Sequence, residues 1–135
     1  MPPTVGSRPT ILVVDNEPAV LNLVKLILEA AGYVVLAACN GRQALAFCNN
    51  RNHSIDLLLT DINIPDISGL ELACQVSQIV PRLPVIFLTR GRAENPGIEL
   101  LRRAGPFSDC EVIGKPFTSP ELLGEIAAIF STTPR

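Results

Sequence analysis

Five residues that can bind metal ions or phosphoryl groups each stand at or just after the end of a short apolar run: Asp15, Glu17, Asp61, Thr89 and Lys115. Three carboxylates and one ammonium give this set a net charge of −2, which a single divalent cation would cancel. Mg²⁺ suits such a set because it binds oxygen ligands and needs only one or two carboxylates besides waters and substrate oxygens. A lysine and a hydroxyl nearby can hold phosphoryl oxygens. The residue types therefore predict Mg²⁺-dependent phosphoryl chemistry.

The elements that must bring these residues together follow from the apolar pattern. Strands are expected over residues 10–14, 33–38, 55–60, 85–88 and 111–113. Helices are expected from Pro18 to Gly32, around residues 44–48, from Ser68-x-x-Glu71 to about Val80, over 96–104, and from Thr118-x-x-Glu121 to Phe130. Five strands that alternate with five helices predict an α/β fold, a doubly wound parallel sheet with helices on both faces.

Finer details of the packing can also be predicted. Asn40-Gly41 is expected to form a turn, and Phe117 is expected in the core. The apolar face of the first helix is expected to hold Val20, Leu23, Val24, Ile27 and Ala31. That of the last helix is expected to hold Leu122, Leu123, Ile126, Ala127 and Phe130.

In an open parallel sheet, ligands bind at the carboxyl ends of the strands. The residues expected there are, in chain order, Asp15, Asn16, Glu17, Asp61, Asn63, Thr89 and Lys115. Five of them have a simpler explanation when taken alone: Asp61 as a strand-ending acid, Asn16 and Glu17 as helix caps, Thr89 as a β-branched strand residue and Lys115 as a solvated loop lysine. Their occurrence together at neighbouring strand ends favours a shared site.

Length, net charge and cysteine spacing limit the classes of protein to which the chain can belong. The 135 residues suit one domain, with a lead-in over 1–9 and a tail over 131–135 around a domain at 10–130. The net charge of −2 argues against direct binding of nucleic acid, and no apolar stretch reaches transmembrane length. None of the four cysteines forms a Cys-x-x-Cys pair, so we expect core thiols in a reducing cytoplasm. The single histidine, His53, lies among polar residues and is expected in a surface loop.

Ordered motifs give the chain a resemblance to a known family. The run Val13-Val14-Asp15-Asn16-Glu17-Pro18 is followed by Asp61 with Pro65 and Gly69 four and eight residues onward, then by Thr89 after an apolar strand, and by Lys115-Pro116-Phe117. From Thr10 to Phe130 the sequence resembles the receiver domain of two-component response regulators, the family of the chemotaxis response regulator. The resemblance implies a flavodoxin-like sheet with strand order 2-1-3-4-5.

The resemblance also implies a role for each residue of the site. Asp61 would accept a phosphoryl group from the phosphohistidine of a sensor histidine kinase or phosphotransfer protein. Mg²⁺ would be held by Asp15, Asn16, Asp61 and the backbone carbonyl of Asn63. Lys115 would pair with Asp61 and then with the phosphoryl group, and Thr89 would turn toward it as a switch. The protein would act as a cytoplasmic signalling domain rather than as an enzyme, through a downstream protein or an output domain, with no contact to membranes.

Four features depart from the family pattern. Asn16 stands where a second acid is usual, which predicts weaker Mg²⁺ binding because one negative charge is missing. Arg90 follows Thr89 where a small residue is usual, and Val112 replaces the aromatic switch residue. The segment 105–110 is longer than usual.

These departures keep a second hypothesis open, a degenerate receiver that binds partners without phosphorylation. A third hypothesis is an enzyme or cofactor binder of similar fold. A dehalogenase-like phosphatase would need Asp-x-Asp where Asp61-Ile62-Asn63 stands, and a dinucleotide fold would need Gly-x-Gly-x-x-Gly, which the chain lacks.

Overall fold

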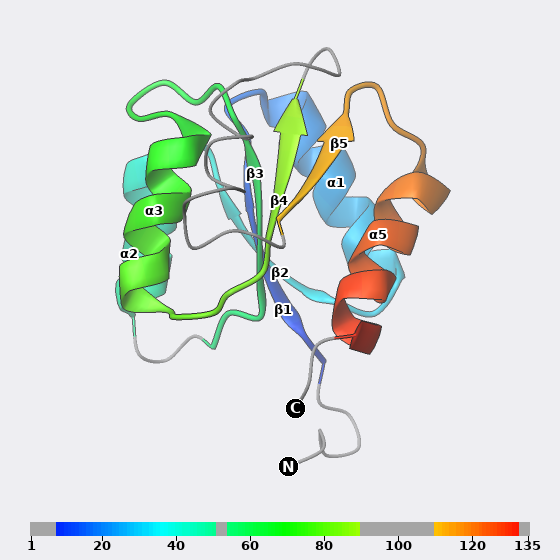
Figure 1. The fold of residues 1–135 in the computed structure, drawn as a ribbon. Coiled ribbons are helices and arrows are strands. Elements are labelled where there is room, and N and C mark those ends of the chain that lie inside the picture. Colours follow the sequence, from blue (N-terminus) through cyan, green and yellow to red (C-terminus); the bar gives the residue numbers. More distant parts are fainter. Residues whose placement is uncertain (1–7, 51–53, 90–109, 133–135) are drawn as a thin grey trace.

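The computed structural model describes residues 8–50, 54–89 and 110–132, which form five strands and four helices in a repeating βα pattern (Figure 1). The strands are β1 (Thr10–Val14), β2 (Val34–Ala38), β3 (Leu57–Asp61), β4 (Val85–Thr89) and β5 (Glu111–Gly114). The helices are α1 (Pro18–Ala30), α2 (Gly41–Asn49), α3 (Gly69–Ile79) and α5 (Ser119–Thr132).

All five strands are parallel and lie in the order β2-β1-β3-β4-β5. This is the flavodoxin-like order that the sequence resemblance implied. Because β1 lies between β2 and β3, the chain reverses its direction of winding at β1. The carboxyl ends of β1 and β3 therefore lie side by side, which is where an open α/β sheet binds its ligands.

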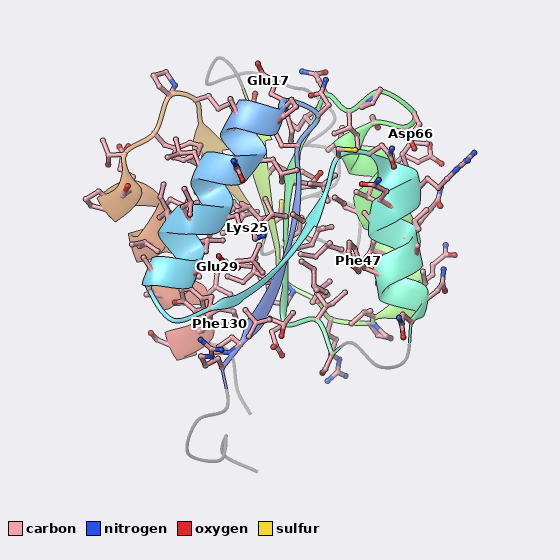
Figure 2. The ribbon with its side chains drawn as sticks, turned by 180° about the vertical axis from the view of Figure 1, so that it is seen from behind. Glu17, Lys25, Glu29, Phe47, Asp66 and Phe130 are labelled. Carbon is pink, nitrogen blue, oxygen red and sulfur yellow. The ribbon has the colours of Figure 1, made fainter. Side chains whose placement is uncertain are left out.

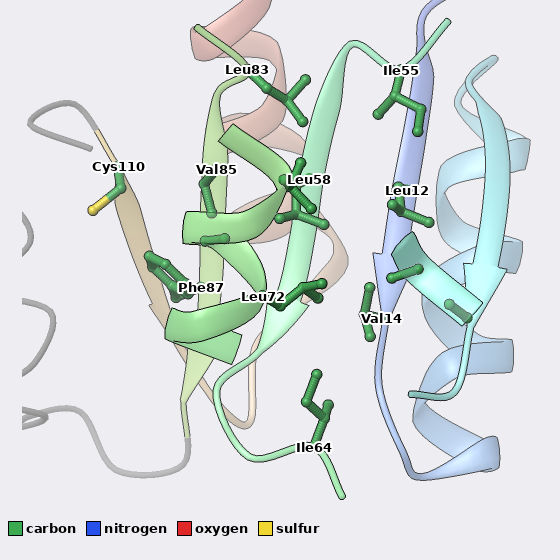
Figure 3. Close-up of a cluster of buried hydrophobic side chains, with 14 of the residues drawn as sticks. Leu12, Val14, Ile55, Leu58, Ile64, Leu72, Leu83, Val85, Phe87 and Cys110 are labelled. Carbon is green, nitrogen blue, oxygen red and sulfur yellow. The ribbon is translucent and has the colours of Figure 1, made fainter. Parts of the chain in front are cut away.

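Two apolar layers hold the helices on the sheet. Successive residues of β1 point to opposite faces, so Leu12 and Val14 pack in the layer under α2 and α3, while Ile11 and Val13 pack in the layer under α1 and α5. Figure 3 shows the first layer, where Phe87 and Leu72 lie among the aliphatic side chains of β1, β3 and β4. Because helices cover both faces of the sheet, the side chains of β1 and β3 are buried on both sides. This is why the sequence of each of these strands is an almost continuous apolar run.

Local signals set the helix ends. The Ser68 hydroxyl accepts a hydrogen bond from Glu71 N at the start of α3, which is one half of the predicted capping box, while the Glu71 carboxylate accepts a bond from Gln75 Nε2. At the start of α5, Thr118 N donates to Glu121 Oε1 at 2.8 Å and Glu121 N donates to Thr118 Oγ1 at 3.2 Å, a complete reciprocal box. Gly32, with φ of 98°, follows α1 and ends it as predicted.

Most element predictions are confirmed to within two residues. The helix expected over 96–104 lies outside the described residues, as do His53, Arg90 and the tail residues 133–135. The lead-in and tail boundaries stay predictions. Among the described residues, no helix is long and apolar enough to span a membrane.

Several finer predictions are wrong. Asn40-Gly41 is not a turn but the start of α2, with the Asn40 side chain accepting a hydrogen bond from Gln43 N. In α1, Val20, Val24 and Ile27 pack against the core as predicted, but Leu28 is buried in place of Leu23, which is 54% exposed. Ala31 and Ala127 are exposed as well. Phe117 is only partly buried, although it packs against the layer under α1 and α5 as predicted.

The prediction that the four cysteines lie in the core is confirmed for some of them. Cys110 is buried, Cys48 and Cys74 are half-buried, and Cys39 is exposed. Cys39 lies just past the end of β2, where the chain leaves the core and turns into α2.

Candidate functional site

The site lies at the carboxyl edge of the sheet, where four strands end at or next to polar residues. Asp15 directly follows β1, Asp61 is the last residue of β3, and Lys115 directly follows β5. Thr89 ends β4, and its carbonyl accepts a hydrogen bond from Lys115 N at 2.7 Å, which fixes the start of the lysine's loop. The sheet register thus brings together residues that are up to 100 positions apart in the sequence.

Lys115 links the two carboxylates. Its Nζ donates to Asp15 Oδ2 at 2.9 Å and to Asp61 Oδ2 at 3.1 Å, and lies 3.9 Å from Glu17 Oε1. The Lys115 side chain is only 13% exposed. Burial alone lowers the pKa of Lys115, but hydrogen bonds to Asp15 and Asp61 and their charges outweigh it, so the pKa is raised above its ordinary value. The ammonium is therefore charged at neutral pH and neutralises part of the acidic site.

Asp15 is held rigidly. Its side chain is fully buried, Oδ1 accepts a hydrogen bond from Glu17 N at 2.9 Å, and Asp15 N donates to Ala38 O at 3.1 Å. Glu17 is the N-cap residue of α1 but makes no side-chain capping bond, so its predicted capping role is wrong. Asn16 is exposed beside this site.

The loop after Asp61 is closely packed against the end of β3. Asn63 N donates to Asp61 Oδ1 at 3.2 Å, and Gly69 N donates to Ile62 O at 2.7 Å. A Cβ at Gly69 would collide with the carbonyl oxygen of Asp61 and lie 2.8 Å from the Cα of Ile62. Only glycine fits there, because the first turn of α3 passes directly over the backbone of Asp61.

The donor set fits a hard divalent cation. Asp15 and Asp61 offer carboxylate oxygens; the exposed Asn16 directly follows Asp15, and the exposed Asn63 lies two residues after Asp61. No group of three His, Cys, Asp or Glu side chains suited to a metal occurs within the described ranges. Two carboxylates with amide, carbonyl and water oxygens are nevertheless a normal environment for Mg²⁺, which keeps several of its waters.

The expected switch residue, Thr89, and Val112, which replaces the aromatic switch residue, lie on the adjacent strands β4 and β5. Thr89 is half-buried at the end of β4. Val112 on β5 pairs with Phe87 and is partly buried against the α2 and α3 layer. Arg90 and the segment 105–109 lie outside the described residues.

Comparison with known protein families identifies the architecture. The model of the response regulator receiver domain matches residues 11–127, which include every residue of the site. The chain belongs to the response regulator receiver domain family. The receiver domain is part of two-component signalling, and its doubly wound sheet has the flavodoxin-like form.

Individual relatives agree with this assignment. The chain is 34% identical over 126 residues to the phosphate regulon transcriptional regulatory protein PhoB of Pseudomonas aeruginosa, covering 92% of this chain and 52% of that protein. It is 36% identical over 120 residues to the transcriptional regulatory protein CpxR of Klebsiella pneumoniae, covering 88% of this chain and 48% of that protein. The receiver domain thus spans about half the length of these relatives.

Solved structures show the same fold. A CheY-like response regulator receiver domain protein from Methanospirillum hungatei superimposes with a TM-score of 0.81 at 33% identity, covering 93% of this chain and 95% of that one.

One polar residue near the site, Asp66, was not singled out from the sequence. It contacts α2, which is 25 positions away in the sequence, and no local pattern signals such a bond.

Proposed function

We propose that residues 10–130 form a phosphorylatable receiver in which Asp61 accepts a phosphoryl group from the phosphohistidine of a sensor histidine kinase or phosphotransfer protein. The observation that carries this proposal is the position of Lys115, whose Nζ bonds to both Asp61 and Asp15 at the carboxyl edge of the sheet. A carboxylate held in this way is oriented for attack, while the cation stays beside the oxygens that will carry charge.

In the proposed reaction, an Asp61 carboxylate oxygen attacks the phosphorus atom. The bond from phosphorus to the histidine nitrogen breaks, and its electron pair stays on the imidazole. Asp61 becomes an acyl phosphate with a charge of about −1.5 to −2 and three additional acceptor oxygens. The Lys115 ammonium and the Thr89 hydroxyl are the groups of the chain that would donate hydrogen bonds to these oxygens.

Mg²⁺ is the proposed cofactor, with Asp15, Asn16, Asp61 and the carbonyl of Asn63 as candidate ligands. When bound, the ion would neutralise charge on the phosphoryl oxygens. Supporting this proposal, hydrogen bonds from Glu17 N to Asp15 and from Asn63 N to Asp61 hold both carboxylates at the same edge of the sheet. We propose Thr89 as the residue that reports phosphorylation, since it ends the strand next to β3.

This role is that of a signalling domain rather than of a classical enzyme. The proposed output is a protein contact, either to a separate target or to an output domain. Because the relatives are named transcriptional regulators and are about twice as long as the matched region, the expectation of no nucleic-acid contact is kept only for residues 10–130. Binding of DNA by a longer form of the protein is a separate proposal.

The function is tested by incubating the protein with acetyl phosphate and Mg²⁺ and measuring its intact mass. We expect a species heavier by one phosphoryl group that is lost in Asp61→Asn and in the presence of EDTA. Ser68→Ala is a matched control, because it changes the same loop but leaves the carboxylate in place. A folded protein that gains no phosphoryl mass from either acetyl phosphate or a phosphorylated kinase would support the degenerate-receiver alternative instead.

A further inference from the structure

Asp66 connects the loop after the phosphoacceptor to a different helix. The residue is exposed and lies in the segment between β3 and α3. Its Oδ1 accepts a hydrogen bond from Gly41 N at 2.8 Å, and its Oδ2 accepts one from Arg42 N at 2.9 Å. Figure 2 shows Asp66 at the upper end of α2, where these two amides lie.

The two amides are the first of α2, and they have no acceptor within the helix. The third, Gln43 N, donates to the Asn40 side chain at 2.8 Å, and the fourth, Ala44 N, donates to Asn40 O at 3.2 Å. Asn40 and Asp66 therefore divide the free amides of this helix between them. Asn40 belongs to the helix end itself, whereas Asp66 comes from the loop that follows Asp61.

The carboxylate of Asp66 is well suited to this contact. The hydrogen bond from Gly41 is the main cause that lowers the pKa of Asp66, and the bonds from Arg42 and Ile67 act in the same direction. A negative charge at the positive end of the helix dipole is also favourable. Gly41 is closely covered as well, since a Cβ there would lie 2.6 Å from Cγ1 of Ile67.

Backbone contacts within the loop pair its two ends, and apolar side chains beside its tip pack on the core, since Ile64 is buried and Ile67 packs against the layer under α2 and α3. Gly69 N donates to Ile62 O, and Asn63 and Ser68 form an isolated bridge. Pro65 and Asp66 lie between these paired residues. Among the contacts of the described residues, the two bonds from Asp66 to α2 add a polar attachment at the tip to the apolar packing of Ile64 and Ile67.

We propose that Asp66 is a positioning residue for the phosphoacceptor site: by tying the loop to the N-terminus of α2, it holds the backbone carbonyl of Asn63 where that carbonyl can bind Mg²⁺ beside Asp61. The inference rests on the proposed function. The coupling acts in both directions. If the contact between Asp66 and α2 favours Mg²⁺ binding, then Mg²⁺ binding stabilises that contact by the same free energy. Binding of Mg²⁺ is therefore expected to protect the amides of Gly41 and Arg42 from hydrogen exchange.

The test compares Asp66→Ala with Asn40→Ala. Both remove an acceptor from the N-terminus of α2, but only the first cuts the connection to the loop. Mg²⁺ affinity is measured by titration calorimetry at a temperature where circular dichroism shows each variant folded. We expect Asp66→Ala to weaken Mg²⁺ binding by about tenfold, as is typical when a group that orients a metal ligand is lost. Asn40→Ala should change it by less than about twofold, and Asp66→Asn should recover part of the loss.

Hydrogen exchange gives the second readout. In the parent, Mg²⁺ should slow exchange at Gly41 and Arg42, and in Asp66→Ala this response should disappear. Equal Mg²⁺ affinities in the parent and Asp66→Ala, or equal losses in Asp66→Ala and Asn40→Ala, would overturn the positioning role while leaving phosphorylation of Asp61 intact. A parent that binds no Mg²⁺ would overturn both the positioning role and the proposed cofactor.

Discussion

Replacing Lys115 by methionine should destabilise the protein far more than removing one of its acidic partners. Lys115 Nζ lies 2.9 Å from Asp15 Oδ2 and 3.1 Å from Asp61 Oδ2. At these distances each pair attracts by about 5 kcal/mol with an effective dielectric constant of about 20. Most of that attraction offsets the cost of removing the ammonium and the carboxylates from water. Among the described residues, Lys115 is the cation bonded to both carboxylates, so taking it away leaves two acids, one of them fully buried, without its charge.

We expect Lys115→Met to lose about 3 kcal/mol of unfolding free energy, which is the usual cost of breaking a buried ion pair from one side. Asp61→Asn should lose no more than about 1 kcal/mol, because Lys115 keeps its bond to Asp15 and the repulsion between two carboxylates disappears. Saturating Mg²⁺ should restore part of the stability of Lys115→Met, since the ion supplies the missing positive charge.

Urea denaturation followed by far-ultraviolet circular dichroism measures these differences, in low salt and with EDTA or Mg²⁺. Similar slopes of unfolding free energy against urea are needed for a valid comparison. If Lys115→Met lost less than about 1 kcal/mol of unfolding free energy, or if Asp61→Asn lost as much as Lys115→Met, then Lys115 would not be needed to neutralise the buried carboxylates.

Three further predictions follow from other contacts. Gly69→Ala should lower the unfolding free energy by about 2 kcal/mol and weaken phosphorylation, because its Cβ would collide with the Asp61 carbonyl. Urea denaturation and intact-mass measurement check this, and unchanged stability and phosphorylation would contradict it. Asn16→Asp should tighten Mg²⁺ binding by about tenfold, or roughly 1.4 kcal/mol, in a calorimetric titration, whereas equal affinity would show that this charge is irrelevant. The pKa of Asp66 is lowered from 3.8, so its carboxylate adds stability above that pH and loses it as the pH falls through the folded-state pKa. Parent and Asp66→Asn should therefore differ most near neutral pH and converge below pH 3.8, and a difference independent of pH would argue against the charged bonds.

The strands and the site were predictable from the sequence because their signals are local. Each strand is an apolar run that ends at a polar residue, and parallel strands put those ends at one edge. Once the order of elements was known, Asp15, Asp61 and Lys115 had to lie close together. Gly69 is part of the motif that resembles the family, but the sequence does not show how closely α3 passes over Asp61.

Other details depend on packing between distant segments. The first helix contains the almost continuous apolar stretch Leu21 to Leu28, which allows more than one choice of buried face. Contact with the sheet selects Val24 and Leu28 and leaves Leu23 exposed. The start of α2 was read as a turn because Asn-Gly is common in turns, yet Asp66 from a distant loop completes it as a helix end.

The central claim is that Asp61 carries the phosphoryl group. Its most direct test is peptide mapping of the protein after reaction with a phosphodonor and Mg²⁺, under conditions that preserve acyl phosphates. We expect one phosphoryl group on Asp61, which is lost on treatment with hydroxylamine and is absent when EDTA replaces Mg²⁺. A phosphoryl group on another residue, or a folded protein that stays unmodified with an active donor, would contradict it.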